Sequence, residues 1–493
     1  MGLGSNYYLT LGLPVDASPE EIRVAYFEAA RHMHPDVNPA PRAAEQFIRV
    51  QEAYDTLSSP EKRTIYNSTL PPEVFTQPPI NFNITYSRQS LPRTSEKQLV
   101  YVLMDVMAIP QETDSQDMPL NICLVLDRST SMQGTRMDMV KANTIQLLRQ
   151  LKPDDIISVV AFSDRAEVVL PATHASELSK LESRISLMQS SGGTEIYQGL
   201  AAGVEQVRQY ARPTAINHIL LLTDGRTYGD EKLCLDLARE AVHDGIGISG
   251  MGIGHEWNDE FLDELSAISG GNSIYVSMPK DLRRHLEQKF NNLGKIYAEN
   301  LRLDVKIDPN VELQYAFRIQ PDTAVLPMEQ PIRLGNILKM RNLSVIFEFL
   351  VSDTTQIEDV IHLMSGTMVM DIPTRMAPTT RLRLNLKVPV TENGDSTTPN
   401  PVIVQAMSRL TLYRMQQKAR EEVAAGEIDR AAQRLQRLAT HLLAQGEREL
   451  AHTVLVEAEH IKQSERFSKE GDKRIKYGTR ALLLPSGMEN QIL

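Results

Sequence analysis

Cysteine is nearly absent from this chain, with two residues in 493. Cys123 and Cys234 lie far apart and neither belongs to a CxxC pair, so the sequence predicts neither a disulfide framework nor a zinc site. Cys123 stands in an apolar run, which indicates a position in a hydrophobic core. We therefore expect a protein of a reducing compartment and place it in the cytoplasm.

Basic clusters and long apolar runs are missing too. The formal net charge of -11 argues against a nucleic-acid binder, because such proteins carry a basic footprint. The apolar runs, such as residues 120–126, fall far short of the roughly 20 residues that span a bilayer. The opening "MGLGSNYYLT" has no basic segment followed by an apolar one, and Asn6 stands where myristoylation requires Ser or Thr. We expect a soluble protein that has no secretory signal and does not insert into membranes.

The usual enzyme motifs are also absent. The sequence has no GxxxxGK[ST], HExxH or GxSxG, so phosphoryl transfer, zinc proteolysis and serine hydrolysis lack their customary parts. Residues 245–250 match GxGxxG but enter a strand pattern, whereas a dinucleotide fingerprint must follow a strand and open a helix. His255 and Glu256 fit a surface loop better than a ligand pair. We expect a protein that is not an enzyme.

What the chain does contain is several domains, since 493 residues exceed a single core and a prior of roughly 150 residues per domain suggests about three. In the first block, residues 5–69, a capping box at Ser18 opens an amphipathic helix that stops before Pro35. A second helical pattern follows Pro41 and ends near Leu57, and a short third one carries "PEKRTIYN". Two antiparallel helices would leave the connecting loop exposed at their tip.

That loop holds His34, Pro35 and Asp36, within "ARHMHPDVNPAP". A His/Asp pair could serve acid-base chemistry, bind a metal, stop a helix or present a surface to another protein. An exposed loop tip offers no burial that would tune either pKa, which disfavours acid-base chemistry.

The stretches "NYYLTLGL", "ASPEEIRVAYFEAARHMHPDVNP" and "AYDTLSSPEKRTIYN" together resemble the J domain of DnaJ-type co-chaperones, over about one eighth of the chain. The resemblance implies that the loop and the preceding helix dock onto a DnaK-type chaperone and trigger its ATP hydrolysis. Carried over by position, the trigger is His34, Pro35 and Asp36, and the docking face includes Arg23 and Tyr26.

Three positions depart from the family pattern. Phe27 and Glu28 stand where the family often has Lys or Arg, and Val37 replaces a basic residue after the tripeptide. Charge changes at an exposed rim mainly alter the association rate and its salt dependence. We expect weak or selective docking to the chaperone.

Residues 70–96 are rich in proline and polar residues without a period, which indicates an extended linker. The chain has no Gly/Phe-rich segment and no cysteine-rich zinc module, so the client-binding parts of a general DnaJ are missing. Something downstream must therefore supply the targeting.

Between residues 119 and 294, apolar runs that indicate strands alternate with helical patterns. The alternation predicts a doubly wound, Rossmann-like sheet with right-handed crossovers, and a ligand site at the carboxyl ends of its strands. The helical patterns cover residues 137–151, 177–188, 196–210, 231–243, 259–268 and 282–293.

Oxygen-bearing side chains lie in three loops of this alternating region. Two carboxylates and three hydroxyls on one sheet edge suit a hard divalent cation, Mg²⁺ first, with Mn²⁺ or Ca²⁺ as alternatives. The set is Asp127, Ser129, Ser131, Thr194 and Asp224. It resembles the metal-ion-dependent adhesion site of von Willebrand factor type A (vWA) domains. The resemblance implies that the three hydroxyls contact the metal directly and that the two aspartates act largely through water. It also implies that an acidic side chain of a protein partner completes the coordination of the metal. The alternative is a vWA fold whose site is vestigial.

Strict alternation of apolar residues returns between residues 297 and 391 and predicts an antiparallel β-sandwich. We expect a strand within residues 97–118 to join this sandwich, which makes the vWA domain an insertion and predicts a rigid pair. Residues 401–467 read as three helices that cap the sandwich, and residues 468–493 as a tail with no assignable chemistry.

The expected architecture is thus multidomain α/β: an all-α J domain, a doubly wound vWA domain, a β-sandwich and a helical bundle. The expected function is that of a bacterial J-domain co-chaperone or adaptor that recruits a DnaK-type ATPase to a protein held by the metal-dependent vWA module. The alternative is a metal-dependent scaffold or assembly factor whose J domain is weak or serves for docking only.

Overall fold

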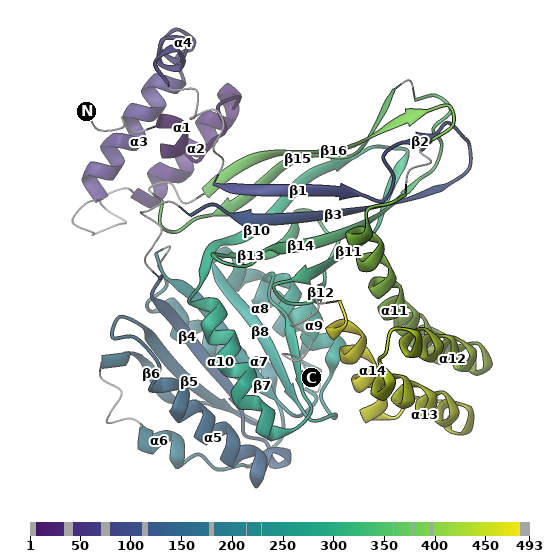
Figure 1. Cartoon of the computed structure of the whole chain (residues 1–493). Helices are drawn as coiled ribbons and strands as arrows, with labels where there is room; N and C mark the ends of the chain where they lie inside the picture. The colour runs from purple at the N-terminus through teal and green to yellow at the C-terminus, as the bar shows by residue number, and fades with distance from the viewer. Residues whose placement is uncertain are drawn as a thin grey trace.

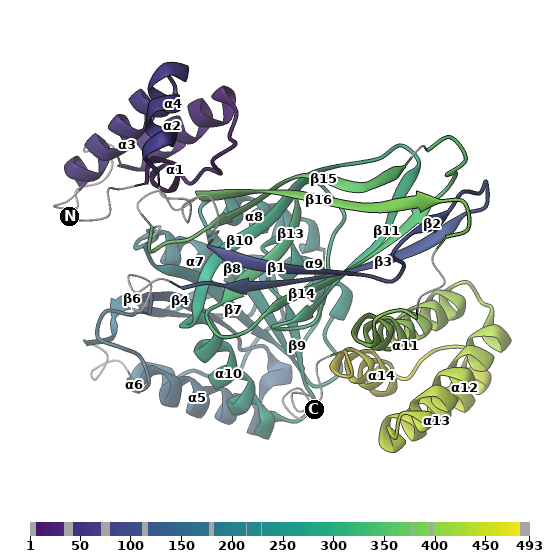
Figure 2. The same ribbon diagram turned by 45° about the horizontal axis from the view of Figure 1, so that its top comes forward.

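The chain folds into four units. The computed structural model describes residues 6–33, 43–70, 79–110, 117–176, 182–212, 214–227, 229–357, 359–375, 379–394 and 398–483. An N-terminal helical unit lies above a β-sandwich, a vWA-type α/β unit lies below the sandwich, and a C-terminal helical unit lies beside both (Figure 1). In the two views of Figures 1 and 2 the N-terminal and C-terminal helical units occupy opposite sides of the molecule. Within the described ranges, no helix combines the length and the hydropathy needed to cross a membrane.

The N-terminal unit contains α1 (Tyr7–Thr10), α2 (Pro19–Met33), α3 (Ala43–Leu57) and α4 (Pro60–Thr69). The predicted capping box opens α2: the Glu21 amide donates to Ser18 Oγ at 3.2 Å and the Ser18 amide donates to Glu21 Oε2 at 2.6 Å. The core between α2 and α3 consists of small and branched side chains, among them Ile22, Ala25, Val50 and Ala53. The tripeptide His34, Pro35 and Asp36 lies outside the described residues, as does Val37.

The sandwich consists of two five-stranded sheets. One has the order β1 (Ile80–Tyr86), β3 (Gln98–Ala108), β14 (Leu343–Val351), β11 (Val311–Gln320), β12 (Ala324–Val325). The other has the order β13 (Ile332–Leu338), β10 (Ile296–Ile307), β15 (Val360–Asp371), β16 (Thr379–Thr391), β2 (Leu91–Pro92). Neighbouring strands are antiparallel except β2 and β16, which pair in parallel. Alternate side chains from both sheets form the core.

The expectation of an extended linker over residues 70–96 is wrong for its second half. Residues 80–86 form β1, which pairs with β3 from Ile80 opposite Ala108 to Tyr86 opposite Val102. The strand was missed because β1 is an edge strand with mostly half-buried side chains, so its apolar alternation is diluted by Asn81 and Asn83.

Strand β3 lies between β1 and β14, and its register with β14 runs from Gln98 opposite Val351 to Val106 opposite Leu343. The chain therefore leaves the sandwich after β3, builds the vWA unit and returns to the sandwich at β10. The vWA unit is an insertion between two strands of one sandwich.

The vWA unit has one six-stranded sheet in the order β6 (Ala166–His174), β5 (Ile156–Phe162), β4 (Leu120–Asp127), β7 (Ile216–Thr223), β8 (Ile246–Ile253), β9 (Ser273–Val276). All neighbours are parallel except β5 and β6, which form an antiparallel pair at one edge. The stretch that matches GxGxxG begins one residue before β8 and continues into it, and both cysteines are buried and free.

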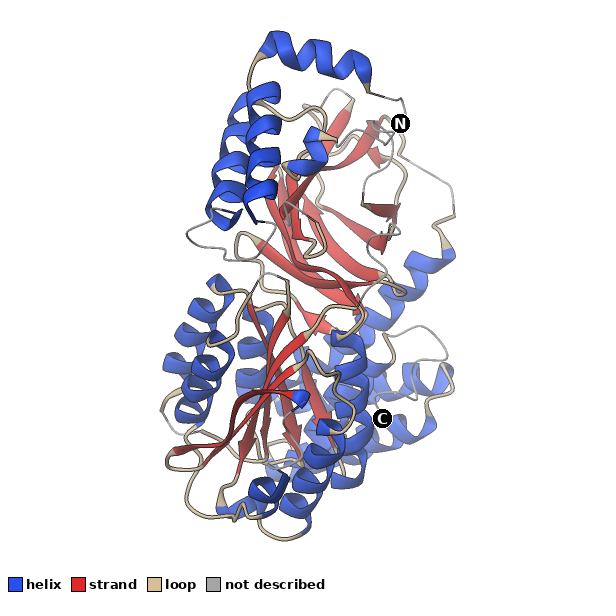
Figure 3. Ribbon diagram, turned by 90° about the vertical axis from the view of Figure 1, so that its left-hand side faces the viewer, coloured by secondary structure: helices blue, strands red, loops and turns tan. Residues whose placement is uncertain are grey.

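Helices cover both faces of this sheet (Figure 3). One face packs against α5 (Thr135–Leu148), α6 (Glu182–Ser186) and α10 (Leu282–Leu293), and the other against α7 (Ile196–Arg208), α8 (Glu231–His243) and α9 (Asp259–Ile268). Helix α6 is shorter than the predicted helix 177–188, of which residues 177–181 lie outside the described part. The bounds of α8, α9 and α10 coincide with the predicted ones.

A buried arginine joins the vWA unit to the sandwich. Arg318 of β11 donates to the carbonyl oxygens of Gly270, Gly271 and Leu334 at 2.8, 2.8 and 2.9 Å, and its other contacts are with Asp322. Its side chain is 2% exposed, so the guanidinium fills the junction between the two units. Because a buried charge must be satisfied in full, this junction fixes how the two units sit against each other.

The C-terminal unit has four helices: α11 (Pro401–Ala424), α12 (Ile428–Ala444), α13 (Arg448–Ser464) and α14 (Lys469–Ala481). Helix α11 covers the sandwich, where Ile403, Leu410 and Tyr413 pack on Phe317 and Ile346. The reading of residues 468–493 as a tail is wrong for its first half, because α14 is a buried helix that lies against α9 of the vWA unit.

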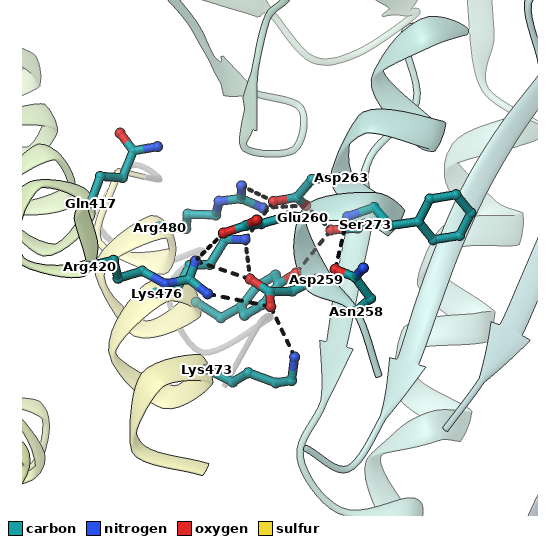
Figure 4. Close-up of polar contacts among 12 residues, drawn as sticks. Asn258, Asp259, Glu260, Asp263, Ser273, Gln417, Arg420, Lys473, Lys476 and Arg480 are labelled. Atoms are coloured by element: carbon teal, nitrogen blue, oxygen red, sulfur yellow. Dashed lines mark hydrogen bonds and ion pairs between the residues drawn. The ribbon is translucent and has the colours of Figure 1, made fainter. Parts of the chain in front are cut away.

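Charged side chains make up much of the α14 contact (Figure 4). Asp259 accepts hydrogen bonds from Lys473 at 3.1 Å and from Arg420 at 3.2 Å, and a shorter one from Lys476. Asp263 pairs with Lys476 at 2.9 Å and with Arg480. The cations of α14 in this cluster are nearly fully buried. This burial is not predictable from the sequence, because lysine and arginine usually indicate a solvent-exposed surface.

The cluster holds the carboxyl groups of Asp259 and Asp263 in the charged form. Burial alone would raise the pKa of Asp259, but the charges of Lys476, Arg420 and Lys473 outweigh it and hold the pKa well below the ordinary value. Burial is likewise outweighed at Asp263 by Arg480 and Lys476, so that pKa is lowered too. A carboxyl with a lowered folded-state pKa stabilises the fold above its unfolded pKa and loses this contribution as the pH falls.

We therefore predict that α14 separates from the vWA unit in acid, below a pH near the ordinary aspartate pKa of 3.8. Trp257, the one tryptophan of the chain, packs beneath Lys473 with 4.2 Å between Nζ and the ring centre and reports on this contact. Its emission should shift to longer wavelength as the pH falls through this range. A shift already complete above pH 5 would contradict the assignment.

The matched substitution pair is Asp259→Asn and Asp138→Asn, since Asp138 lies exposed on α5. Breaking a buried pair costs about 3–5 kcal/mol, so Asp259→Asn should lower the free energy of unfolding markedly and alter the emission of Trp257 at neutral pH. Asp138→Asn should leave both unchanged.

Candidate functional site

The five predicted oxygen-bearing residues meet at the carboxyl edge of the vWA sheet. Asp127 ends β4, Ser129 and Ser131 belong to the turn that follows, and Asp224 follows β7. Ser131 Oγ lies 2.9 Å from Ser129 Oγ and donates to Asp224 Oδ1 at 2.6 Å. The Thr194 hydroxyl packs against Gly225, the neighbour of Asp224. The structure therefore brings the whole predicted set together.

Local hydrogen bonds explain why the turn adopts this shape. The Ser129 amide donates to Asp127 Oδ1 at 2.8 Å, which folds the chain back over the end of β4. Thr223 Oγ1 donates to Asp127 Oδ2 at 2.6 Å from the adjacent strand. Thr130 Oγ1 donates to the Gly192 carbonyl at 3.0 Å and joins the turn to the Thr194 loop. The sequence did not single out Thr223, although its place in "LLTDG" directly before Asp224 was a usable signal.

The two carboxylates are buried close together. Burial raises the pKa of Asp127 to about 6 and the neighbouring Asp224 adds to this increase, while hydrogen bonds from Thr223 and Ser129 oppose it. The Asp224 side chain is 0% exposed and pairs with Arg136, whose Nη1 lies 2.5 Å from Asp224 Oδ2. Sequence reasoning missed Arg136, because it lies outside the DxSxS pattern.

The donor set fits a hard divalent cation. Carboxylate and hydroxyl oxygens are the ligands that such ions prefer, and two acids packed beside three hydroxyls provide negative charge and oxygen lone pairs in one place. Two of the five residues are acids, and among the residues that the structure describes there is no cluster of three or more His, Cys, Asp or Glu side chains that could hold a metal ion, so binding here depends on the hydroxyls as well. The edge therefore suits a metal that binds oxygen, with Asp127, Ser129, Ser131, Thr194 and Asp224 as the residues that would hold it.

The two described residues of the predicted chaperone-docking face lie on α2. Arg23 is exposed and its guanidinium bonds to both carboxylate oxygens of Glu20, at 3.1 and 2.6 Å. Tyr26 is half-buried, and its ring stacks on that of Tyr54 with 4.2 Å between centroids. Phe27 beside it is 61% exposed, so this side of α2 carries an apolar patch beside a cation.

Glu28 has a different role from the one that its position suggested. It accepts a hydrogen bond at 2.6 Å from Arg381 of β16 in the sandwich. Arg383, two residues along the same strand, pairs with Asp16 at 3.0 Å and with Glu21 at 3.2 Å. The acidic side of the N-terminal helical unit thus faces two arginines of the sandwich.

The backbone takes part in this contact as well. The Arg381 amide donates to the Gly12 carbonyl at 2.9 Å, so the loop after α1 caps the edge of β16. A Cβ on Gly12 would lie 1.7 Å from the Thr379 carbonyl oxygen, and Gly12 has φ of +65°. Only glycine fits this approach.

The helical repeat separates the sandwich contact from the docking face. Glu21 and Glu28 are seven residues apart, which places both on one side of α2. At about 100° per residue, Arg23 is about 200° from Glu21 around the helix axis, so it points away from the sandwich. The contact with β16 therefore leaves the Arg23 side of α2 accessible.

A cleft of about 510 Å³ lies between α9, α11 and α14, and its cations are Arg420, Lys476 and Arg480. Each of these three is paired with an aspartate of the cluster described above. The cleft thus marks the junction of three units, with its cations committed to holding α14 in place.

Family comparisons identify three segments of the chain. The DnaJ domain matches residues 6–67, the von Willebrand factor type A domain matches residues 121–289, and the Sll0103-like, C-terminal alpha-helical domain matches residues 401–485. The chain is therefore a multidomain protein that joins a DnaJ domain and a VWA domain in one polypeptide. The third match includes α14, so this helix belongs to the C-terminal helical domain and not to a tail.

Two curated relatives span several units. An uncharacterized protein, sll0103, of Synechocystis sp. is 29% identical over 273 residues, 52% of this chain and 63% of the relative. The uncharacterized protein YfbK of Escherichia coli K12 is 22% identical over 323 residues, 64% of this chain and 52% of the relative. The chain spans less than two thirds of the length of these relatives. Chaperone protein DnaJ 2 of Thermus thermophilus is 50% identical over 68 residues, which are 14% of this chain and 24% of the relative.

Two solved structures share the fold. The von Willebrand factor type A protein from Catenulispora acidiphila has a TM-score of 0.63 at 17% identity and covers 82% of this chain and 96% of its own. The ArnB paralog VWA2 from Sulfolobus acidocaldarius has a TM-score of 0.54 at 13% identity and covers 83% of this chain and 100% of its own. Such coverage exceeds the VWA segment alone, so the similarity of fold extends beyond that domain.

The charge pairs between α2 and β16 predict a rescue by charge reversal. Glu28→Arg and Arg381→Glu should each place like charges together and loosen the DnaJ domain, whereas the double variant restores the attraction. Because the pair is partly exposed, the coupling should be about 0.5–1 kcal/mol and should weaken in high salt.

Hydrogen exchange of the Arg381 amide measures the effect, because Gly12 protects that amide. Exchange should be faster in each single variant and return towards the original rate in the double variant. Glu52→Arg, an exposed change on α3, serves as the control. Equal exchange in every variant would contradict the proposed contact.

Proposed function

We propose that this protein is a J-domain co-chaperone that acts as an adaptor. Its DnaJ domain recruits a DnaK-type ATPase and stimulates it, while its VWA domain holds a protein partner or client. The observation that carries the proposal is the way in which the DnaJ domain is attached to the sandwich. The acids of α2 and of its preceding loop pair with arginines of β16, while Arg23 and Phe27 are exposed to solvent. A chaperone bound to that outward side would stand at a defined place relative to the VWA domain.

The partner is held, in this proposal, through a divalent metal at the carboxyl edge of the VWA sheet. Mg²⁺ is the first choice for the all-oxygen set, with Mn²⁺ or Ca²⁺ as alternatives. The hydroxyls of Ser129, Ser131 and Thr194 would bind the ion directly, and Asp127 and Asp224 would act largely through water. The ion supplies a positive centre that an acidic side chain of the partner can bind.

The proposal assigns ATP hydrolysis to the chaperone and no bond cleavage to this chain. The acidic net charge of -11 disfavours nucleic acid as the partner. The cytoplasm of a bacterium is the compartment that we propose, where a DnaK-type chaperone has ATP and the two buried thiols stay reduced.

A metal-dependent scaffold or assembly factor is the second candidate. One observation favours it: Phe27 is 61% exposed at a position of α2 where the family often has Lys or Arg, so the predicted docking side of α2 carries less positive charge. A DnaJ domain of this kind could dock a chaperone without stimulating it. The ATPase measurement below separates the two candidates.

Asp36→Asn should abolish stimulation of the chaperone's ATPase while leaving the fold intact. The expected loss is complete at concentrations where the unchanged protein stimulates the ATPase severalfold. Steady-state ATP hydrolysis by the DnaK-type chaperone of the same organism is the measurement. Asp55→Asn, an exposed change on α3, provides the matched control. If Asp36→Asn stimulates the chaperone as well as the control does, the co-chaperone assignment fails and the scaffold remains.

Mg²⁺ should stabilise the protein, and Ser131→Ala should remove that effect. At a metal concentration about 100 times the Kd, binding adds about 2.7 kcal/mol to the free energy of unfolding. Thermal unfolding with added Mg²⁺ and with EDTA measures this. Ser131→Ala also removes a hydrogen bond to the buried Asp224, so each variant is compared with itself in the presence and absence of metal.

Capture of the protein partner in a pull-down should depend on the same residue and on Mg²⁺. Ser186→Ala, an exposed serine on α6, serves as the control. Equal stabilisation by Mg²⁺ of the Ser131→Ala variant and the unchanged protein would contradict the assigned site, and capture that survives EDTA would rule out the metal bridge.

A further inference from the structure

An arginine from outside the DxSxS pattern belongs to the metal edge. Arg136 lies in the first turn of α5, directly after the loop that carries Ser129 and Ser131. Gly134, with φ of +82°, caps α5 and turns the chain back towards the sheet. As a result the guanidinium returns over the edge of the sheet.

Two hydrogen bonds hold the guanidinium in place. Nη1 of Arg136 lies 2.5 Å from Asp224 Oδ2 and 3.2 Å from the Ser131 carbonyl oxygen. A Cβ on Gly254, in the loop after β8, would lie 3.3 Å from Nη2, so the group fits between Asp224 and that loop. The Arg136 side chain is 32% exposed, while that of Asp224 is 0% exposed. The guanidinium therefore borders the site on its solvent side.

The other charges around the edge are committed to different partners. Arg128 pairs with Glu167 at 3.4 Å, and Arg226 donates through Nε to the Glu256 carbonyl at 3.1 Å. Lys469 of α14 pairs with the Glu256 carboxylate. Among the described residues, Arg136 is the cation that the structure places in contact with a carboxylate of the metal-ligand set.

The charges of the site then follow from a simple sum. Asp127 and Asp224 contribute two negative charges, the three hydroxyls contribute none, and Arg136 contributes one positive charge. A divalent cation added to the two aspartates alone would give a neutral site. With Arg136 present, the loaded site carries one positive charge, which the carboxylate of an acidic ligand neutralises.

We propose that Arg136 makes the metal-loaded site selective for a carboxylate and makes metal and carboxylate bind cooperatively. The proposal rests on the metal site of the proposed function. Arg136 and the metal repel each other, so the metal alone binds more weakly than it would without the arginine. The carboxylate is attracted by both cations, and by linkage it raises the affinity for the metal by the same factor as the metal raises the affinity for the carboxylate.

Arg136 acts in this scheme as a specificity-determining residue. A role in holding the loop alone would depend on its hydrogen bonds, whereas the role proposed here depends on its charge. Glutamine keeps a hydrogen-bond donor and removes the charge, and lysine keeps the charge and removes the planar fork. The two substitutions therefore separate charge from geometry.

The test is titration of the full chain with Mg²⁺ by calorimetry, in the presence of acetate or of acetamide as the neutral analogue. In the unchanged protein acetate should tighten the apparent Kd for Mg²⁺, and acetamide should not. Arg136→Gln should bind Mg²⁺ alone about tenfold more tightly, the scale on which groups around a metal change its affinity, and should show a smaller acetate effect, because only the metal then attracts the carboxylate. Arg136→Lys should keep the acetate effect. Arg149→Gln, at the C-cap of the same helix and paired with Glu182, is the matched control.

The outcomes separate this inference from the proposed function. If the unchanged protein and Ser131→Ala respond equally to Mg²⁺, the metal site itself is wrong. If Mg²⁺ binding depends on Ser131 but Arg136→Gln binds Mg²⁺ no more tightly and keeps the acetate effect in full, the charge role of Arg136 is overturned. Circular dichroism checks the fold of each variant, and Arg136→Met is the second neutral variant should the glutamine variant not fold.

Discussion

The pairing of β3 with β14 is the interaction on which the rest of this molecule depends. Gln98–Ala108 and Leu343–Val351 are separated in sequence by the whole VWA unit, yet they are neighbours in one sheet. Both ends of the VWA unit are therefore tied to the sandwich, one through β3 and the other through β10. The buried guanidinium of Arg318 then fills the junction between the two units. The result is a platform to which both helical units are attached.

The two helical units are attached to this platform by ion pairs of different kinds. The pairs of α14 with α9 are buried, and breaking one would leave an uncompensated charge, which costs about 3–5 kcal/mol. The pairs of α2 with β16 are partly exposed, and each contributes about 1 kcal/mol or less. The C-terminal unit therefore moves with the VWA unit. The DnaJ domain has a preferred position that it can leave at modest cost, which would suit the encounter with a chaperone that we propose.

Features that depend on neighbours in sequence could be predicted from the sequence alone. The buried strands of the VWA sheet, the bounds of α8 to α10 and the five oxygen-bearing residues at its edge follow from apolar runs, helical periods and side-chain chemistry at strand ends. What could not be predicted depends on partners far along the chain. Strand β1 forms only because it pairs with β3. Helix α14 buries Lys473 and Lys476 against Asp259, although lysine side chains are almost always exposed. Arg136 was missed for the same reason, because its partner Asp224 lies 88 residues away.

Glu28 shows how such a distant partner changes a functional reading. Taken alone, an acid on α2 suggests a weakened chaperone-docking face. In the structure Glu28 points to Arg381, on the side of the helix that also carries Glu21, and Arg23 points elsewhere. The charge of Glu28 is neutralised within the protein, so it does not measure the affinity for a chaperone. What bears on that affinity is Phe27, which is exposed, and Arg23, whose guanidinium is held by Glu20. Because the Arg23–Glu20 pair is exposed, exchanging Glu20 for an acid of the chaperone costs little. The acid therefore serves to orient the DnaJ domain, and the predicted docking face keeps the cation of Arg23.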